Sequence, residues 1–274
     1  MKKIISFGLL LVLCLGLFAC AEPPLEEADL VISFLKTGKS DAILIKIGST
    51  SILIDTGYAA SMGEIDNALE REGVERLDYL ILTHFDKDHI GSAPTLLTRY
   101  EVGQVYMPNF TVDTDEYRTL ITTLASTEVP CTRLERDTTL TLPRGATLRM
   151  NPTALTPTDD NNQSLICALR WDDFGCLFLA DALKDRLEEY WEIDTSTYDV
   201  VKLPHHGNYY KKLEGYLQVV SPAYGIVCCG EEREVEEQLI TMCRDLGITL
   251  FRTDEGAIRL TFDRASGTYQ LKQA

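Results

Sequence analysis

Positive charge and histidine are both scarce in this chain. Only four of its 274 residues are histidine, and 26 lysines and arginines face 42 aspartates and glutamates, giving a formal net charge of −16. This excess of negative charge excludes a general attraction to nucleic acid or to anionic lipid, so a polyanionic substrate would have to be captured locally. The eight cysteines lack the paired spacing of a zinc site, and no repeat or low-complexity segment is present. A hydrophobic content of 45% excludes disorder and predicts one or at most two globular domains.

Long hydrophobic runs are also rare. One such run, residues 4–19, follows two lysines and is too short for a membrane span but suits a signal-peptide core. It closes with Leu17, Phe18, Ala19 and Cys20, which resembles a bacterial lipobox in which the cysteine is lipidated, although Phe18 is bulkier than usual. We expect a signal peptide over 1–20, a tether over 21–29, and an extracytoplasmic domain over 30–274 that is anchored to the membrane at Cys20. An ordinary signal peptide cleaved near Ala21, or an uncleaved anchor, is the alternative.

The first part of the domain predicts a β-meander. Short β-branched runs at 30–36, 42–47 and 51–54 are separated by Gly38, Gly48 and Gly57. Further strands are expected at 77–82, near Val105, at 131–134, near Leu140 and Leu148, at 164–170, 176–179 and 200–203, at 226–228, near Leu250 and at 258–262. Helices are expected at 62–72, 90–100, 116–125, 182–191 and 209–219. Two β-rich halves, each covered by helices, predict an α/β four-layer αββα sandwich with a groove where the strand-end loops meet.

Four potential metal ligands follow the strand 77–82. They are His84, Asp86, Asp88 and His89, within the segment THFDKDHIG over residues 83–91. Neutral imidazole and carboxylate are the usual ligands of zinc and manganese, and a tight loop between strand and helix can direct several of them at one point. A solvated, helix-capping turn is the alternative.

The other two histidines are adjacent, and they also follow a strand. His205 and His206 alone could form a surface turn, but beside the first cluster they are better interpreted as ligands. Asp181 follows the strand 176–179 and precedes a helix, so it could cap that helix, bridge two metals, or do both. Asp55 follows the strand 51–54, where it could hydrogen-bond the ligand loop or form an Asx turn.

The order of Asp55, the loop 84–89, Asp181 and His205 resembles the motifs of the metallo-β-lactamase superfamily over nearly the whole domain. More narrowly, four segments resemble the C-terminal domain of ComEC competence proteins: SDAILI at 40–45, THFDKDHIG at 83–91, NNQSL at 161–165 and KLPHHG at 202–207. This resemblance implies a nuclease or related phosphodiesterase, with single-stranded DNA among its possible substrates. It also implies a centre of two divalent metal ions, with His84 and Asp86 on one, Asp88, His89 and His205 on the other, and Asp181 between them.

On this resemblance Asp88 and Asp181 are the catalytic candidates, and a hydroxide bound by both metals would attack the phosphodiester. The many carboxylates shift the expected metal from pure Zn2+ toward Mn2+ or a mixture. Residues expected near the substrate or behind the ligands are Asp55, Asn161, Asn162, His206, Tyr209 and Lys211. Tyr209 could stack on a base and Lys211 could meet a phosphate, although the start of an amphipathic helix would explain both equally well. We infer no protein partner.

The sequence departs from the superfamily pattern at one ligand. A third histidine before Asp181 is missing, and Asn161 or Asn162 stands in its place, as a weak ligand, a water holder or only a turn. Ala180 and Asn208 also replace the usual glycine and serine. The missing histidine argues against hydrolysis of a lactam, lactone or thioester, which remains an alternative. A weakly catalytic metal-binding lipoprotein, and a teichoic-acid phosphodiester as substrate, also remain open.

Overall fold

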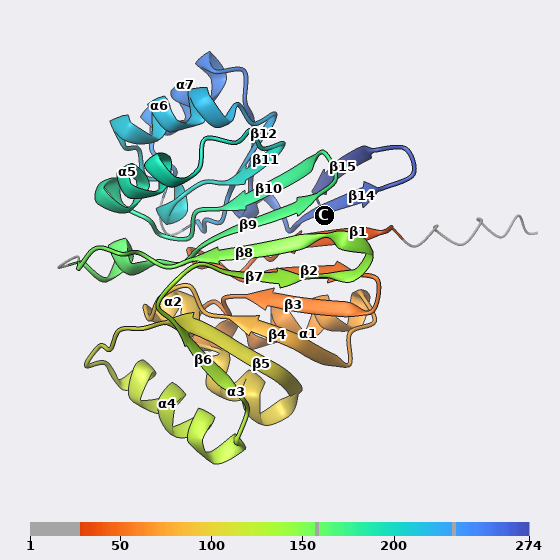
Figure 1. Cartoon of the computed structure of the whole chain (residues 1–274), viewed down its shortest axis with the longest axis vertical. Coiled ribbons are helices and arrows are strands. Elements are labelled where there is room, and N and C mark those ends of the chain that lie inside the picture. Colours follow the sequence, from red (N-terminus) through yellow and green to blue (C-terminus); the bar gives the residue numbers. More distant parts are fainter. Residues whose placement is uncertain (1–27, 157–158, 232–233, 274) are drawn as a thin grey trace, which may run out of the picture.

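The computed structural model describes residues 28–156, 159–231 and 234–273. The predicted signal peptide, Cys20 and nearly all of the expected tether lie outside these ranges. Within them, two β-sheets face each other and helices cover both outer sides (Figure 1). No helix in the described ranges is long and apolar enough to cross a bilayer.

The first sheet has eight strands in the order β15-β14-β1-β2-β3-β4-β5-β6. Its strands are β1 Leu30–Phe34, β2 Ile43–Ile47, β3 Thr50–Ile54, β4 Arg76–Ile81, β5 Glu101–Pro108, β6 Cys131–Leu134, β14 Ile258–Asp263 and β15 Thr268–Gln273. The first three pair antiparallel, which confirms the predicted meander, whereas β3 to β6 run parallel. Antiparallel pairing of β14 with β1 brings the last strands of the described chain beside the first.

The second sheet has seven strands in the order β13-β12-β11-β10-β9-β8-β7. Its strands are β7 Thr138–Thr141, β8 Thr147–Asn151, β9 Ile166–Trp171, β10 Phe174–Phe178, β11 Val200–Lys202, β12 Tyr224–Val227 and β13 Thr249–Arg252. Strands β7 to β10 pair antiparallel and β10 to β13 parallel.

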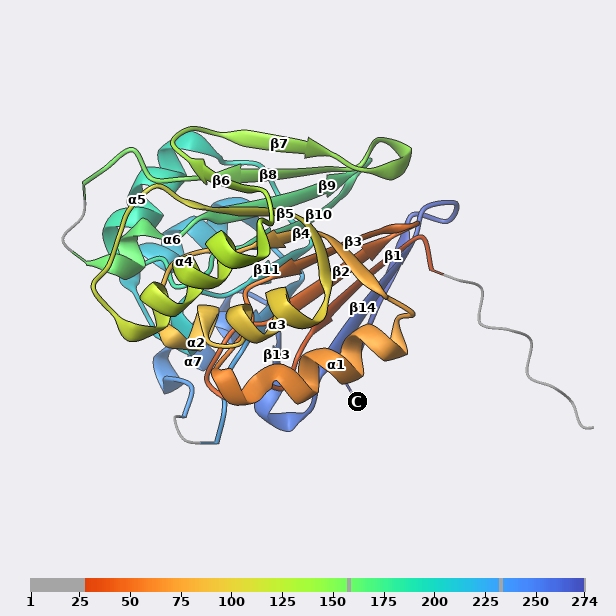
Figure 2. The same ribbon diagram turned by 90° about the horizontal axis from the view of Figure 1, so that it is seen from below.

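Helices cover the outer side of each sheet. Figure 2 shows α1, α3 and α4 across the first sheet, while α5, α6 and α7 lie beyond the second in Figure 1. The helices are α1 Met62–Arg71, α2 Lys87–Ile90, α3 Ala93–Arg99, α4 Asp115–Thr127, α5 Lys184–Ile193, α6 Lys211–Val220 and α7 Glu237–Asp245. Short 3-10 turns are η1 Ala59–Ser61, η2 Pro143–Gly145, η3 Asp160–Gln163, η4 His205–Gly207 and η5 Thr253–Glu255.

Three apolar layers hold the four structural layers together. Ile32 of β1 and Phe178 of β10 belong to the cluster between the two sheets, and one further cluster lies between each sheet and its own helices. Buried apolar side chains on both faces of both sheets explain why inner strands such as β1, β3 and β10 consist of almost continuous apolar runs. The predicted αββα sandwich is confirmed.

The structure differs from the sequence prediction in three places. The helix expected over 90–100 is divided into α2 and α3, and α3 starts anew with a proline in its first turn, where the missing N–H costs nothing. Helix α5 begins at Lys184 with Leu183 as its N-cap, so the possible capping role of Asp181 is wrong. Helix α7 and strand β15 were not predicted, although the buried Leu239, Met242 and Cys243 have helical spacing.

Candidate metal centre

The loops that carry the predicted ligands all leave the same edge of the sandwich. Asp55 follows β3 and the loop 84–89 follows the parallel strand β4, so both lie beyond the carboxyl ends of neighbouring strands. Asp181 and the pair at 205–206 follow the parallel strands β10 and β11 in the same way. Parallel strands end at one edge of a sheet, and the two facing sheets bring these loops into contact.

Tight turns aim these side chains. Eight described residues other than glycine have a positive φ, and four of them are in these loops: Asp55 at 57°, Ala180 at 48°, His205 at 47° and His206 at 54°. Left-handed backbone is unfavourable for residues with a Cβ, and such strain concentrates where the surrounding structure fixes a functional site.

Three imidazoles in these loops are oriented alike. The Nδ1 atom lies 2.8 Å from Asp55 Oδ2 in His89, 2.9 Å from the Cys228 carbonyl oxygen in His206, and 3.1 Å from Thr83 Oγ1 in His84. Thr83 Oγ1 donates its own proton to Asp55, so all three partners accept from the imidazoles. With a metal bound, each ring would carry its proton on Nδ1 and present the lone pair of Nε2 to the space between the loops.

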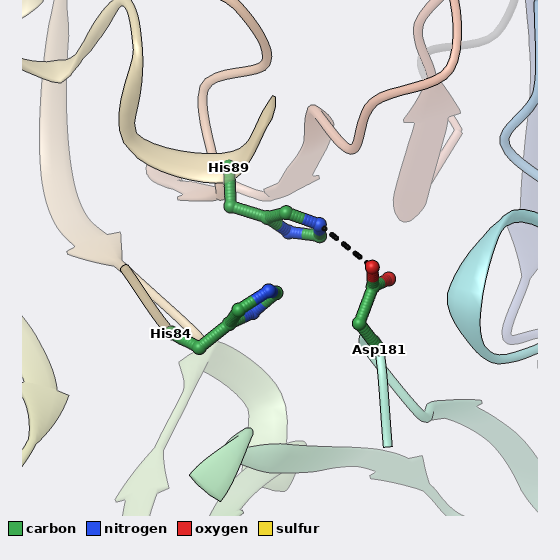
Figure 3. Close-up of side chains that lie close together, drawn as sticks. All are labelled: His84, His89 and Asp181. Atoms are coloured by element: carbon green, nitrogen blue, oxygen red, sulfur yellow. Dashed lines mark ion pairs between the residues drawn. The ribbon is translucent and has the colours of Figure 1, made fainter. Parts of the chain in front are cut away.

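Four buried polar atoms that face this space form no hydrogen bond in the described part of the chain. The Nε2 atoms of His84, His89 and His206 and the Oδ1 atom of Asp181 are buried, and none has a hydrogen-bond partner among the described residues. Asp181 Oδ2 lies 3.3 Å from His89 Nε2 and 3.1 Å from His206 Nε2. Figure 3 shows both loop imidazoles and the carboxylate turned toward one point. Polar atoms so arranged are costly unless a ligand completes them.

Two overlapping groups of side chains could each hold a metal ion. One consists of His84, His89 and Asp181, the other of Asp88, His89 and His206, and in each group the ligand atoms lie within 4.8 Å of one another. His89 is common to both, but its single Nε2 lone pair can bind only one ion, so two ions would divide these ligands, with His84 and Asp181 available to one and Asp88, His89 and His206 to the other. Asp181 also contacts His206. Imidazole nitrogens with carboxylate oxygens suit Zn2+ and Mn2+, so the residues present fit a centre of two divalent ions.

Asp86 and His205, which the sequence also assigned as ligands, lie at the margin of these groups. The Asp86 side chain is 45% exposed, with its Oδ2 3.8 Å from His84 Nε2. His205 Nε2 is 4.0 Å from Asp181 Oδ2, and Nδ1 of the same ring contacts the Tyr210 hydroxyl at 2.9 Å and the Asn208 amide nitrogen at 3.0 Å. The structure thus brings His206 rather than His205 into the group, and the assignment of His205 stays a prediction.

The charges of the site favour a cation. Burial, with the nearby His89, lowers the pKa of His84 well below its ordinary value and keeps that ring neutral. Burial acts in the same direction on His89 and His206, but the carboxylate of Asp181 outweighs it and raises both pKa values. The pKa of Asp181 is lowered, because the two imidazoles outweigh its burial. Without a metal, the carboxylates therefore keep protons on the His89 and His206 imidazoles, where a cation would otherwise sit.

Asp55 holds the ligand loop from behind. Its buried carboxylate accepts from Thr83 N at 2.8 Å, from Thr83 Oγ1 at 2.7 Å and from His89 Nδ1 at 2.8 Å. These bonds fix both the loop and the tautomer of His89, which is the first of the two roles expected for this aspartate.

The contacts found for the remaining expected residues are to other parts of the chain. Asn162 Oδ1 accepts from the backbone N–H of Arg186 and so ties η3 to the first turn of α5, whereas Asn161 Oδ1 is buried with no hydrogen-bond partner in the described chain. Tyr209 donates from its hydroxyl to Glu214, and the exposed Lys211 begins α6.

The sequence interpretation missed two charged residues at the centre. Asp41 belongs to two further groups of potential ligands, one with Asp181 and His206 and one with Asp55 and His89. Lys202 is fully buried within β11 beside it. A signal was present, because a lysine inside the apolar strand Val200–Lys202 requires a buried counter-charge.

A hollow of about 810 Å³ lies away from the centre, at the other ends of the strands and beside the turn between β2 and β3. It is lined by charged side chains such as Lys46, Arg71 and Lys272, and by the ion-paired Arg259 and Glu72. Its lining contains no histidine. The candidate centre is thus identified by its chemistry and not by the size of a cavity.

Several known proteins are similar to this chain in sequence. ComE operon protein 3 of Bacillus subtilis is 23% identical over 281 residues, covering 94% of this chain and 36% of that protein. Recombination protein 2 of Haemophilus influenzae is 27% identical over 230 residues, covering 82% and 27%, and competence protein ComA of Neisseria gonorrhoeae is 26% identical over 263 residues, covering 92% and 35%. The chain therefore resembles competence proteins of the ComEC type, but spans only about a third of their length.

Solved structures agree on the fold. The metallo-β-lactamase fold protein YhfI from Bacillus subtilis superposes with a TM-score of 0.59 at 13% identity, covering 89% of this chain and 99% of that one. Igni18, a metallo hydrolase from Ignicoccus hospitalis, gives a TM-score of 0.54 at 12% identity with the same coverage. The sequence profile of the family described as the metallo-beta-lactamase superfamily matches residues 35–231, which is more than half of the chain. With its αββα sandwich and its histidine-aspartate loops, this chain belongs to the metallo-β-lactamase superfamily.

Proposed function

We propose that this protein is a phosphodiesterase that uses two divalent metal ions and acts outside the cytoplasmic membrane, where a lipid on Cys20 anchors it. The observation that carries the enzymatic part is a set of four buried atoms that form no hydrogen bond within the described chain: three imidazole Nε2 atoms and Asp181 Oδ1. Two ions bound there would activate a water and stabilise the oxygens of an in-line displacement at phosphorus.

The ligands favour this substrate class over a lactam. The centre draws on three imidazoles and several carboxylates, and no third histidine precedes Asp181. The names of two relatives, recombination protein 2 and competence protein ComA, refer to recombination and competence, which supports a nucleic-acid substrate. Because the chain has a net charge of −16, contacts to such a substrate would be local, and Lys211 with Tyr209 in the loop after η4 are the candidates.

The residues of the chain have separate tasks in this proposal. Asp181, in contact with both His89 and His206, is the residue that would join the two ion positions. Asp88 holds the second position, and its carboxylate also accepts from Lys39 at 3.1 Å. Asp55 keeps His89 in the tautomer whose Nε2 can bind a metal.

The test uses the full chain purified in detergent and loaded with either Zn2+ or Mn2+. Bound metal is measured by mass spectrometry, and hydrolysis is measured on single-stranded DNA, on an aryl phosphodiester and on a chromogenic lactam. We expect two ions per chain and turnover of the phosphodiesters. The Asp181→Asn variant should lose at least about a hundredfold in rate together with bound metal, because it removes the carboxylate shared by both positions.

The matched control is Asp172→Asn, which changes an exposed aspartate that is paired with Arg264 and lies in the turn between β9 and β10, at the other end of β10 from Asp181. Asparagine tolerates the left-handed φ of 51° at this position, so the control should keep full activity. Turnover of the lactam without turnover of a phosphodiester would overturn the proposal. Two bound ions with no turnover of any substrate would instead indicate a metal-binding lipoprotein.

A further inference from the structure

We propose that the buried ion pair between Lys202 and Asp41 is a positioning device that holds the bridging carboxylate and the His206 side of the metal centre in place. This inference deepens the proposed function and rests on its metal centre. Lys202 comes from β11 of the second sheet and Asp41 from the loop that leads into β2 of the first sheet. Their contact therefore joins the two halves of the sandwich at the centre itself.

Lys202 is held in a polar cage. Its side chain is fully buried, and its ammonium binds Asp41 Oδ2, donates to the Ala180 carbonyl oxygen at 2.9 Å and lies 3.8 Å from Asp181 Oδ1. Burial alone would lower the pKa of this lysine, but the carboxylates of Asp41 and Asp181 raise it, so the group stays charged. An ammonium kept away from water needs such partners, and its loss leaves them uncompensated.

The bond to Ala180 bears directly on the bridging residue. Ala180 has a φ of 48°, a left-handed conformation that is unfavourable for alanine, and it immediately precedes Asp181. Its carbonyl oxygen accepts both from Lys202 Nζ and from His205 N, at 3.1 Å. These two donors fix the strained peptide, and the direction of the Asp181 side chain follows from it.

Asp41 acts on the opposite side of the same contact. Its backbone N–H donates to the Asp88 carbonyl oxygen at 3.2 Å, and its own carbonyl oxygen accepts from Gly57 N at 2.7 Å, so it is attached to the ligand loop and to the turn after Asp55. Its Oδ1 lies 3.6 Å from His206 Nδ1. The ion pair thus connects Asp181, the His206 ring and the ligand loop.

A purely electrostatic role for Lys202 predicts the opposite sign of effect. A fixed positive charge beside a divalent cation repels it, so removing that charge would by itself strengthen metal binding. A positioning role predicts weaker binding, because residues that orient metal ligands typically contribute about 10- to 100-fold in affinity. The direction of the change therefore separates the two roles.

The experiment compares the full-length wild type with Lys202→Met, Asp41→Asn and the double variant Lys202→Met/Asp41→Asn. Metal affinity and stoichiometry for Zn2+ and Mn2+ are measured by calorimetry on metal-free protein, and the Co2+ absorption spectrum reports ligand geometry. Melting temperature is measured without metal. The matched control is Arg186→Met, which also removes a fully buried cation, one that binds Asn151 and Glu189 instead of the centre.

We expect Lys202→Met to weaken metal binding by about 10- to 100-fold and to change the Co2+ spectrum. Arg186→Met should lower the melting temperature but change the affinity by less than about threefold. The double variant should regain much of the melting temperature, because removing both charges leaves no unpaired ion, yet it should keep the weak metal binding.

Unchanged or tighter metal binding in Lys202→Met would overturn the inference, as would wild-type affinity in the double variant. If Lys202→Met does not fold, the double variant decides. A wild type that binds two ions but hydrolyses no phosphodiester would overturn the proposed function and leave this inference standing. A wild type that binds no divalent ion would overturn both.

Discussion

Substituting each of the two adjacent histidines in turn tests which of them is a metal ligand. His206 is 2% exposed, donates from Nδ1 to the Cys228 carbonyl oxygen and directs Nε2 at Asp181 and Asp88, at 3.1 and 3.4 Å. His205 is partly exposed, and its Nδ1 contacts the Asn208 amide nitrogen. The variants His206→Ala and His205→Ala therefore separate a buried ring directed at Asp181 and Asp88 from a partly exposed neighbour at the margin of the centre.

The size of the effect follows from the number of ligands. Binding of a structural zinc ion by four ligands is worth roughly 10–16 kcal/mol, or about 3 kcal/mol per ligand, which corresponds to about a hundredfold in Kd. His206 is one of three residues in its group, so His206→Ala should lose at least that factor for one ion. His205→Ala leaves both groups intact and should lose less than about tenfold.

The assay is calorimetric titration of metal-free full chain with Zn2+ and with Mn2+, which resolves the two ions by their stoichiometry. We expect one strong site to disappear in His206→Ala, while His205→Ala keeps two. A larger loss in His205→Ala than in His206→Ala would refute the geometric argument and support the ligand assignment made from the sequence.

Three further predictions concern the ligand loop, acid stability and the anchor. Gly91→Ala should destabilise the protein in chemical unfolding by about 1–3 kcal/mol or more, because a Cβ there would lie 2.5 Å from backbone atoms. The control is Gly63→Ala in α1, where an added Cβ contacts nothing, and this variant should be neutral or stabilising. Burial would raise the pKa of Glu72, but the hydrogen bonds and charge of Arg259 hold it below 4.5. The stability from this pair is then present above pH 4.5 and is lost as the pH falls below it. The difference in the free energy of unfolding between the wild type and Arg259→Met should therefore shrink at low pH, and a difference that stays constant would contradict this reasoning. Cys20→Ser should move the protein from the membrane fraction to the soluble fraction, and unchanged fractionation would exclude lipid anchoring at this residue.

Local sequence patterns were sufficient to predict the helices and strands whose apolar residues repeat with one clear period. The runs that became β2 and β3 are short, apolar and bounded by glycine, and the buried face of α1 repeats at helical spacing, so both were predicted within a few residues. Strand β15 alternates half-buried and exposed residues at the edge of the first sheet, where no apolar run marks it. Only its pairing with β14 makes it a strand.

The sequence by itself identified the imidazoles that could bind metal, because the only four histidines of the chain all follow apolar strands, but it missed Asp41 among the carboxylates. It did not determine which of two adjacent histidines enters the centre, since that depends on left-handed turns at 205 and 206 and on the group that each Nδ1 contacts, the Cys228 carbonyl oxygen for His206 and the Asn208 amide for His205. Nor did it pair Lys202 with Asp41, which lie 161 positions apart and meet only when the two sheets pack face to face. Ligand chemistry is a property of single residues, whereas tautomer, strain and a buried ion pair belong to the folded contacts around them.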